Sequence, residues 1–271
     1  AGLLDELRCR PRRFSFRKLK DQGAVTENDD TDIRAVGSPF KEVHFEGEQV
    51  ESKLLNKGLT YVIDHDEVED VGAEVQRVAE ALRRRLLRSD YLRMIALLDG
   101  SAVNANKTWD AASNPDGDLR GAIQTSHTKH GLRPTVALIG SAAWEIRADA
   151  YEDSTRANHA MANHAGWSPE ELAAYLGIDH VIIERSLYTI KKKANAKTQT
   201  LAGLAYVYNA LPGIMREDPS VVKRFTGDAT AGGRFGVYVD DLQPKFTKVS
   251  VEHYSRGVIT IAKGIEKRTS S

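Results

Sequence analysis

The stretch VGAEVQRVAEALRRRLLRSDYLRMIALLDG, residues 71–100, is the strongest structural signal in this chain of 271 residues. Apolar residues recur in it every three or four positions, as Val75, Val78 and Leu82 do, which is the spacing of one face of an α-helix. Acids precede its first turn, where the helix dipole favours negative charge. The pattern predicts one helix of roughly 28 residues, about 40 Å long, that ends at Gly100. It is longer than a usual globular helix and too irregular for a coiled coil.

The middle of this helix carries a cluster of positive charge, made of Arg83, Arg84, Arg85 and Arg88. Two interpretations stay open for the cluster. It forms a face that is solvated or salt-bridged along the helix, or it meets acids on a neighbouring copy of the chain.

Residues 41–68, just before the helix, alternate weakly between apolar and polar side chains. The apolar positions are Val43, Phe45 and Val50, followed by Leu59, Tyr61 and Ile63. They predict two strands on either side of a polar turn, ESKLLNKG, at residues 51–58. A two-stranded ribbon is marginal alone, so we expect this hairpin to need a partner surface.

The N-terminal segment is divided by charge. Residues 8–20 contain seven cations and no acid: Arg8, Arg10, Arg12, Arg13, Arg17, Lys18 and Lys20. Residues 21–39 are acidic and have few large apolar side chains, so they cannot bury enough surface to fold alone, and we expect an extended arm. The basic run is either a solvated tail or a contact surface for phosphates or an acidic partner.

The stretch KTWDAASNPDGDLRGAIQ, residues 107–124, raises the question of an active site. Its acids Asp110, Asp116 and Asp118 invite a metal or acid–base interpretation. They flank a Pro-Asp-Gly sequence, however, and Asn and Asp are ordinary turn residues. We therefore interpret them as turn-forming residues first.

The rest of the chain reads as an α/β body. RPTVALIGSAAWEIRADA predicts a strand at 135–139 and a helix from Ser141. WSPEELAAYLGIDHVIIER predicts a helix capped by Ser168 and ended by Gly177, then a strand at 180–184. TLAGLAYVYNA and RFGVYVDD supply further strands. KFTKVSVEHY and GVITIAKGI predict two final strands on either side of a Ser-Arg-Gly sequence at 255–257.

No short motif of catalysis is present. The chain has no phosphate-binding or dinucleotide-binding glycine loop, no His-Glu-x-x-His and no Gly-x-Ser-x-Gly. The pairs His127/His130 and His159/His164 have no cysteine pair to complete a zinc site, so they are interpreted as polar loop residues. Cys9 is the only cysteine, which excludes an intramolecular disulfide and favours intracellular assembly. We predict no catalytic site, no metal and no cofactor.

The bulk composition narrows the function classes. The 38 basic residues balance the 38 acidic ones, so no net charge draws the whole molecule to nucleic acid or anionic lipid. No apolar run approaches the roughly 20 residues that cross a bilayer, and no signal peptide opens the chain. The first residue is Ala1, which either the numbering or proteolytic trimming explains.

The order of these pieces resembles one family across essentially the whole chain. A basic arm, a hairpin, a long helix, an α/β body and terminal strands resemble the α+β Hong Kong 97-type fold of the major capsid proteins of tailed bacteriophages. Four phrases, in the expected order, resemble segments of that family: TWDAASNPDGDLRGAI, GLRPTVALIGSAAWEIRAD, SPEELAAYLGIDHVIIERSLY and VSVEHYSRGVITIAKGIEK. By this resemblance, residues 107–124 are a hinge-like connection and not the rim of an active site.

The resemblance implies a domain organisation. It assigns an N-arm to residues 1–40, an extended E-loop to 41–68, a P-domain to 69–130 with its spine helix at 69–100, an A-domain to 131–241, and C-terminal strands returning to the P-domain at 242–271.

The resemblance also implies a function. The chain would be a structural subunit, not an enzyme, of an icosahedral phage head around double-stranded DNA. It would assemble with itself into pentamers and hexamers in the host bacterial cytoplasm, with portal and scaffold proteins and without a membrane. Its final location would be the virion, with maturation and a decoration protein as further features of the family.

Three sets of contact residues follow from the same resemblance. The DNA-facing basic arm is Arg8, Arg10, Arg12, Arg13, Arg17, Lys18 and Lys20, and the charged face of the spine helix is Arg83, Arg84, Arg85 and Arg88. The contacts of the E-loop between subunits are Glu51, Lys53, Leu54, Leu55 and Lys57. Two alternatives stay open: an encapsulin-like nanocompartment shell that holds enzymes, and a motif-poor α+β enzyme with His127, His130 and Asp118 as candidates.

Overall fold

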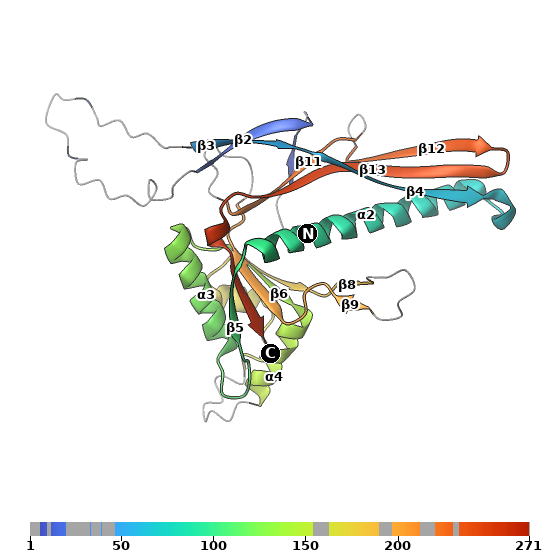
Figure 1. Cartoon of the computed structure of the whole chain (residues 1–271). Coiled ribbons are helices and arrows are strands. Elements are labelled where there is room, and N and C mark those ends of the chain that lie inside the picture. Colours follow the sequence, from blue (N-terminus) through green and yellow to red (C-terminus); the bar gives the residue numbers. More distant parts are fainter. Residues whose placement is uncertain are drawn as a thin grey trace.

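The computed structural model describes residues 6–9, 12–19, 33, 39, 47–153, 163–189, 197–211, 220–229 and 233–270. Within these residues the chain builds two five-stranded sheets joined by one long helix, α2 (Val71–Ser101) (Figure 1). The carboxylate of Asp70 caps the helix by accepting a hydrogen bond from the backbone of Ala73. The predicted long helix is confirmed, although it continues one residue past Gly100.

The first sheet is centred on the long strand β13 (Phe246–Ile259). Strands β11 and β12 both pair with β13, and β1 pairs with β11, which gives the order β1-β11-β13-β12. Strand β4 also pairs with β13, outside this order. The bounds of these strands are β1 (Glu6–Arg8), β4 (Leu55–Asp64), β11 (Val222–Gly227) and β12 (Phe235–Gln243). Val249 and Val251 of β13 are buried against Val78, Leu82 and Leu86, so the N-terminal half of α2 covers this sheet.

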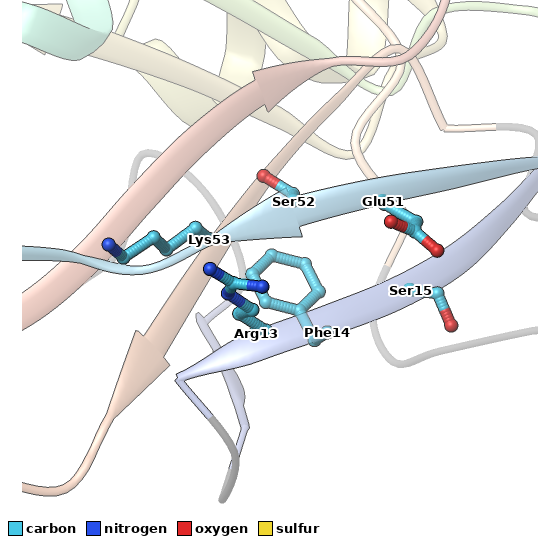
Figure 2. A pocket seen from close by; sticks show the side chains of 6 residues that line it. All are labelled: Arg13, Phe14, Ser15, Glu51, Ser52 and Lys53. Carbon is cyan, nitrogen blue, oxygen red and sulfur yellow. The ribbon is translucent and has the colours of Figure 1, made fainter.

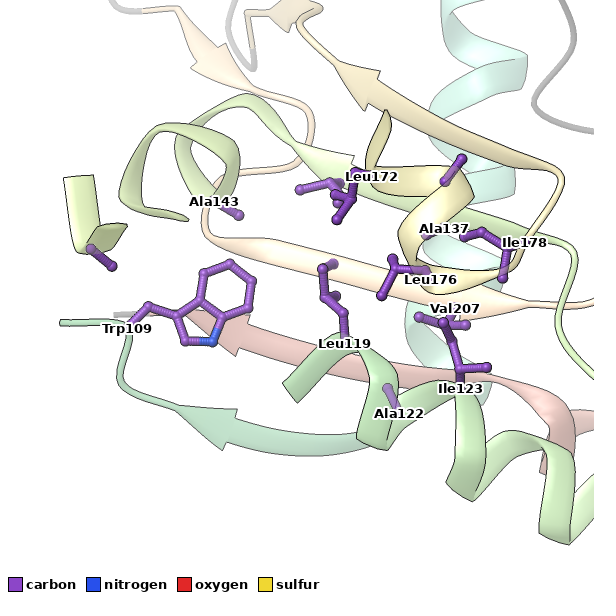
Figure 3. Packing of buried hydrophobic residues seen from close by; sticks show 14 residues of the cluster. Trp109, Leu119, Ala122, Ile123, Ala137, Ala143, Leu172, Leu176, Ile178 and Val207 are labelled. Atoms are coloured by element: carbon purple, nitrogen blue, oxygen red, sulfur yellow. The ribbon is translucent and has the colours of Figure 1, made fainter. Parts of the chain in front are cut away.

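The second sheet has the order β5-β14-β10-β6-β7. Its strands are β5 (Val103–Lys107), β6 (Val136–Gly140), β7 (His180–Glu184), β10 (Leu204–Tyr208) and β14 (Glu266–Ser270). Three helices pack on one face: α3 (Pro115–His130), α4 (Ser141–Glu152) and α6 (Pro169–Leu176) (Figure 3). The C-terminal half of α2 packs on the other face through Met94, Ile95 and Leu98.

Strand β6 shows why this second sheet is well buried. Ala137 and Ile139 face the three helices, whereas Val136 and Leu138 face α2. Successive side chains of a strand point to opposite faces, so a strand covered on both faces must be apolar throughout. The sequence VALIG meets this requirement, and all five of its residues are buried.

Six further elements complete the described fold. Strand β2 (Arg13–Leu19) pairs antiparallel with β3 (Gly47–Lys53) to form a two-stranded ribbon. Strands β8 (Leu187–Tyr188) and β9 (Thr198–Gln199) pair in the same way. The 3-10 turns are η1 (His65–Glu67) and η2 (Ala262–Gly264).

The predicted hairpin at 41–68 is wrong. Residues 51–58 form no turn, because β3 ends at Lys53 and β4 begins at Leu55. The two strands pair with different partners, β3 with β2 and β4 with β13. Ten residues of β4 pair along β13, and Ile63 is buried under α2, which an isolated ribbon cannot offer. Positions 43 and 45 lie outside the described residues.

The basic run is not a solvated tail in its described part. Strand β1 pairs in parallel with β11 of the first sheet. In β2, the rings of Phe14 and Phe16 lie 4.4 and 5.2 Å from the ring of Phe225, measured between centroids. Phe14 and Phe16 share one face of β2 and pack on the chain's own core, whereas Arg13, Ser15 and Arg17 belong to the other face.

Two further predictions need correction. The Ser-Arg-Gly sequence at 255–257 does not separate two strands, because β13 runs through it while pairing with β11. The residues expected at 242–271 as one set of returning strands lie in both sheets: β13 packs under α2 in the first sheet, whereas β14 lies in the second sheet between β5 and β10. Likewise α3, expected with the long helix, packs in the core of the second sheet.

The body at 135–184 is confirmed closely. Strand β6 and helix α4 lie where the sequence predicts them. Ser168 and Glu171 form a complete capping box at the start of α6, and Gly177 ends that helix in the left-handed conformation. Strand β7 has the predicted bounds of 180–184.

Candidate functional site

The first candidate surface is the β2–β3 ribbon, which has two different faces. Arg13 lies directly opposite Lys53 in the register, and Ser15 lies opposite Glu51 (Figure 2). Arg13, Lys53 and Glu51 are exposed. The opposite face carries Phe14 and its neighbours, which pack on the core. Like charges placed opposite each other destabilise a strand pair, so the Arg13–Lys53 pair favours an anionic partner.

The other cations of the predicted basic arm are placed differently. Arg8 and Arg12 are exposed, and the guanidinium of Arg12 lies 4.6 Å from the centre of the Tyr254 ring. Arg17 and Lys18 are half-buried, and Lys18 makes an ion pair of 3.1 Å with Glu48. Arg10 and Lys20 lie outside the described residues. The accessible cations of the described arm are therefore Arg8, Arg12 and Arg13.

The residues predicted to contact other subunits from 51–57 do not act together. Glu51, Lys53 and Leu55 are exposed, whereas Leu54 is buried in a core cluster with Phe225. Lys57 points inward and binds the carboxylate of Asp90. Leu54 and Lys57 therefore make their described contacts within their own chain, whereas Glu51, Lys53 and Leu55 are accessible to a partner.

Asp90 forms the centre of a buried polar cluster where α2 crosses the first sheet. Lys57 of β4 and Arg224 of β11 both bind its carboxylate. The hydroxyl of Ser255 in β13 donates a third hydrogen bond of 2.8 Å. Asp90 is almost fully buried, and its three partners come from three different strands. We call this set the Asp90 cluster; it fixes the position of the helix along the sheet.

Three pKa values change in and beside the Asp90 cluster. Burial alone would raise the pKa of Asp90, but the hydrogen bond from Lys57 and the positive charges of Arg224 and Lys57 lower it to about 2. Burial lowers the pKa of His253 to about 4, although the charge of Asp90 opposes this change. Burial also lowers the pKa of Lys57. At neutral pH Asp90 is ionised, and the neighbouring His253, whose ring nitrogen lies 3.3 Å from the Ser255 hydroxyl, is neutral.

Sequence reasoning missed Asp90, although a signal was present. Asp90 lies four residues after Leu86 and four before Met94, both of which are buried on the same face of α2. A carboxylate on an apolar helical stripe is costly to bury unless cations meet it. That position could therefore have predicted a buried ionic contact.

The second candidate surface is the part of the first sheet that α2 leaves uncovered. Tyr61 and Val239 lie on either side of the buried Val249 in one cross-strand row. The helix covers only the middle of the row, so its two ends stay about half exposed, at 49% each. In a second row, formed by Leu59, Val251 and Val237, only the Val237 end is about half exposed, at 49%, because Leu59 packs against the core. We call these ends the apolar flanks; they are surfaces that a partner could cover.

The opposite face of the same strands is mostly polar. Thr60 and Ser250 are joined by a hydrogen bond of 3.0 Å between their hydroxyl groups. Tyr238 donates a hydrogen bond of 2.8 Å to Glu252. No helix of the described chain covers this face. It is consistent with a surface that faces solvent.

The arginines of the long helix form the predicted salt-bridged face in part. Arg83 and Arg84 make ion pairs of 3.4 and 2.9 Å with Glu80. Arg85 and Arg88 are exposed and make no ion pair within the part of the chain that the structure describes. Exposed pairs of this kind contribute little to stability, about 0.3–0.5 kcal/mol each.

The acids of residues 107–124 serve the structure of the second sheet. Asn114 caps α3, and Asp116 in the first turn makes a two-fold ion pair with Arg147 at 2.6 and 2.9 Å. His164 lies 3.1 Å from the same carboxylate and stacks on Trp167. The expectation that these acids are turn-forming is therefore wrong for Asp116, which is fully buried in a helix.

The candidate residues of the enzyme alternative do not converge. Asp118 accepts a hydrogen bond from the Trp109 ring and an ion pair from Lys107. His127 and His130 lie in the last turn of the same helix, so the prediction of loop histidines is wrong for them. Twelve residues of helix separate Asp118 from His130 by about 18 Å. His159 lies outside the described residues.

Within the described ranges, no group of three or more His, Cys, Asp or Glu side chains is arranged to hold a metal ion.

Cys9 is half-buried beside Thr226, and this burial raises the pKa of its thiol. Among the described helices, none is long and apolar enough to span a membrane.

Comparisons with known proteins identify the fold. No family model and no curated protein matches the sequence. Three solved structures illustrate the likeness in three dimensions. A phage-related protein from Bordetella bronchiseptica RB50 has 11% identity and a TM-score of 0.66 over 98% of this chain and 89% of its own. The capsid of cyanophage P-SCSP1u has 9% identity and a TM-score of 0.59 over 99% of this chain and 86% of its own. A virus-like particle from Pyrococcus furiosus has 13% identity and a TM-score of 0.56 over 98% of this chain and 89% of its own. The chain therefore has the α+β fold of phage capsid proteins, and the predicted fold class is confirmed.

Proposed function

We propose that the chain is a major capsid protein, the structural subunit of an icosahedral phage head that encloses double-stranded DNA in the virion. The observation that carries this proposal is the likeness of fold to a cyanophage capsid over 99% of the chain. The apolar flanks support self-association, because a partner copy would bury side chains such as Tyr61 and Val239 that are half exposed in one chain. Repeated contacts of one surface with another close into rings and shells.

The two sheets would belong to the two proposed domains of the subunit. The first sheet and α2 would form the peripheral P-domain, with α2 as its spine helix. The second sheet, with α3, α4 and α6, would form the axial A-domain, copies of which would gather around the axes of pentamers and hexamers. This division places α3 and β14 with the A-domain, in contrast to the boundaries expected at 69–130 and 242–271. Residues 1–40 remain the proposed N-arm, and the β2–β3 ribbon pairs a strand of this arm with a strand of the proposed E-loop at 41–68.

Contact with packaged DNA is proposed for the basic arm. Arg8, Arg12 and Arg13 are accessible cations in the described part, and Lys53 adds a fourth charge opposite Arg13. Cations on an extended strand suit phosphates without reading base sequence. Portal and scaffold proteins, a decoration protein, maturation and assembly in the host cytoplasm belong to the same proposal. A structural and non-catalytic role is supported by the separation of Asp118 from His130.

Electron microscopy of the purified chain under assembly conditions tests the proposal. We expect closed particles. Particles isolated from infected cells, or from cells that also express the phage packaging proteins, should contain nuclease-protected double-stranded DNA. Particles with Arg8, Arg12 and Arg13 all changed to Gln should assemble but hold DNA less tightly as salt is raised. A chain that stays monomeric under all assembly conditions contradicts the proposal.

A second candidate is an encapsulin-like shell that holds enzymes instead of DNA. It is retained because the likeness of fold extends to a virus-like particle from Pyrococcus furiosus, at a TM-score of 0.56, and a shared shell fold does not determine what the shell encloses. The contents of the particles separate the two functions. Protein cargo without protected nucleic acid would support the nanocompartment, and protected double-stranded DNA would support the phage head.

A further inference from the structure

A small hollow lies beside the Asp90 cluster, between α2 and the neighbouring ends of β4 and β13. Its volume is about 230 Å³. Its lining includes the apolar side chains of Leu55, Met94 and Leu97. Arg93 of α2, Arg256 of β13 and Lys57 of β4 also line it. We call this hollow the basic socket. Leu55 and Leu97 are exposed large apolar residues, so its lining is open to solvent.

The basic socket has more positive than negative charge. Asp90 is the only acid of its lining, and Lys57 and Arg224 already bind that carboxylate. Arg93 and Arg256 are exposed, and neither makes an ion pair or hydrogen bond among the described residues. His253 adds no charge near neutral pH, because burial lowers its pKa to about 4. The socket therefore suits an occupant with carboxylates and an apolar side chain.

One segment of the chain has this chemistry. Residues 27–33, ENDDTDI, contain four carboxylates, no cation and one large apolar residue. The side chain of that residue, Ile33, is 89% exposed. The other acidic segment, residues 64–70, is already engaged, since Asp70 caps α2 and Asp66 binds Lys245.

We infer that the basic socket of one copy receives residues 27–33 of a second copy. Carboxylates of the segment would meet Arg93 and Arg256, and Ile33 would pack against Leu55 and Leu97. Opposite charge would set the register and speed the encounter, and burial of the apolar side chains would supply most of the affinity. The inference rests on the proposed function, because it requires self-association.

Cysteine crosslinking between two differently tagged chains tests this contact. Both chains carry Cys9→Ser; one also carries Ile33→Cys and the other Leu97→Cys. After mixing under assembly conditions and mild oxidation, mass spectrometry should find a disulfide between positions 33 and 97 of different chains. The matched control replaces Leu97→Cys with Ala81→Cys, an exposed position on the same helix away from the socket. Equal crosslinking to positions 81 and 97 overturns the inference.

Charge reversal provides the second measurement. Arg93→Glu/Arg256→Glu should slow formation of the 33–97 disulfide at least about tenfold, because the socket would then repel the segment. Arg85→Glu/Arg88→Glu makes the same change in the net charge of the chain, at two positions of α2 outside the socket. This variant should alter the rate less than about twofold. Restoration by Asp29→Arg/Asp30→Arg in the partner chain would confirm direct contact, and equal slowing by both reversals would contradict it.

Three outcomes separate this inference from the proposed function. Closed particles that form without the 33–97 disulfide overturn the inference and leave the capsid function standing. A 33–97 disulfide found only within single chains, when one chain carries both cysteines, also overturns it. If the disulfide joins different chains but no particles form, the contact stands and the capsid function fails.

Discussion

The two sheets of this protein differ in how their apolar residues are covered. The second sheet is enclosed, with three helices on one face and α2 on the other, and residues of β6 are buried in alternation on both faces. The first sheet has α2 over the middle of one face only, and Val237 and Val239 of β12 remain half exposed. One region is complete within the chain, whereas the other has surface that a partner would cover. A subunit of an assembly needs both kinds of region.

The largest effect is expected in the enclosed region, from Asp116→Asn. The change leaves Arg147 fully buried without its charge partner, and breaking a buried ion pair in this way typically costs about 3–5 kcal/mol. Chemical denaturation of the unassembled chain measures the loss in the free energy of unfolding. Asp118→Asn, two residues later on the same helix, is the control, and it should cost less than about 1 kcal/mol. Similar losses for both variants would contradict the described role of Arg147.

The next effect is a dependence on pH in the first sheet, where α2 crosses it. The pKa of His253 is about 4 in the folded chain, below its ordinary value of 6.5, so folding disfavours its protonation. Its stabilising contribution is complete above pH 6.5 and is lost as the pH falls toward 4. At 1.36 kcal/mol per pKa unit the loss amounts to about 3 kcal/mol.

Unfolding of the wild type and of His253→Gln at pH 7.5 and pH 5 measures this contribution. The wild type should lose more stability than the variant between the two pH values. Equal losses would show that other groups cause the acid sensitivity. The variant keeps a polar side chain near Ser255, whose hydroxyl lies 3.3 Å from the His253 ring nitrogen.

A somewhat smaller effect is expected from Asp90→Asn, which weakens the attachment of α2 to the first sheet. The pKa of Asp90 is about 2 in the folded chain against 3.8 for the ordinary group. The corresponding stabilisation, about 2 kcal/mol, is present above pH 3.8 and is lost as the pH falls through 2. At pH 7 the variant should therefore unfold more easily by this amount. Asp99→Asn, on an exposed part of α2, should lose clearly less, and an equal loss would contradict the role of the cluster.

The enclosed region was the more predictable of the two from sequence. Strand β6, helix α6 and strand β7 follow local rules: an apolar run, a capping box and a glycine stop. Such signals lie within a few residues of the element they predict. Helix α2 was predicted for the same reason, since its stripe repeats over its whole length.

The strand pairing of the first sheet could not be predicted in this way. The pairing of β4 with β13 joins residues about 190 positions apart, and nothing local in residues 51–58 distinguishes a turn from two consecutive strands. The β2–β3 ribbon likewise joins 13–19 to 47–53. The Asp90 cluster draws residues from four distant elements, so only the misplaced carboxylate on the helical stripe could have indicated it.

The smallest effect on stability is expected from a valine-to-threonine substitution, made once in the first sheet and once in the second. Val239→Thr on β12 and Val103→Thr on β5 change side chains that are 49% and 47% exposed on strands at the edges of their sheets. Threonine keeps the β-branched shape, so both variants should unfold within about 0.5 kcal/mol of the wild type.

Assembly should separate the two variants, because the apolar flanks are proposed to be covered by another copy and β5 is not. Placing a hydroxyl in a buried contact costs about 1 kcal/mol, which is roughly a fivefold change in an equilibrium constant. Light scattering should therefore show a critical concentration for particle formation that rises several-fold for Val239→Thr and stays unchanged for Val103→Thr. If both variants assemble like the wild type, the flank at Val239 is not an interface. If both fail equally, the contrast between a complete and an incomplete sheet does not explain assembly.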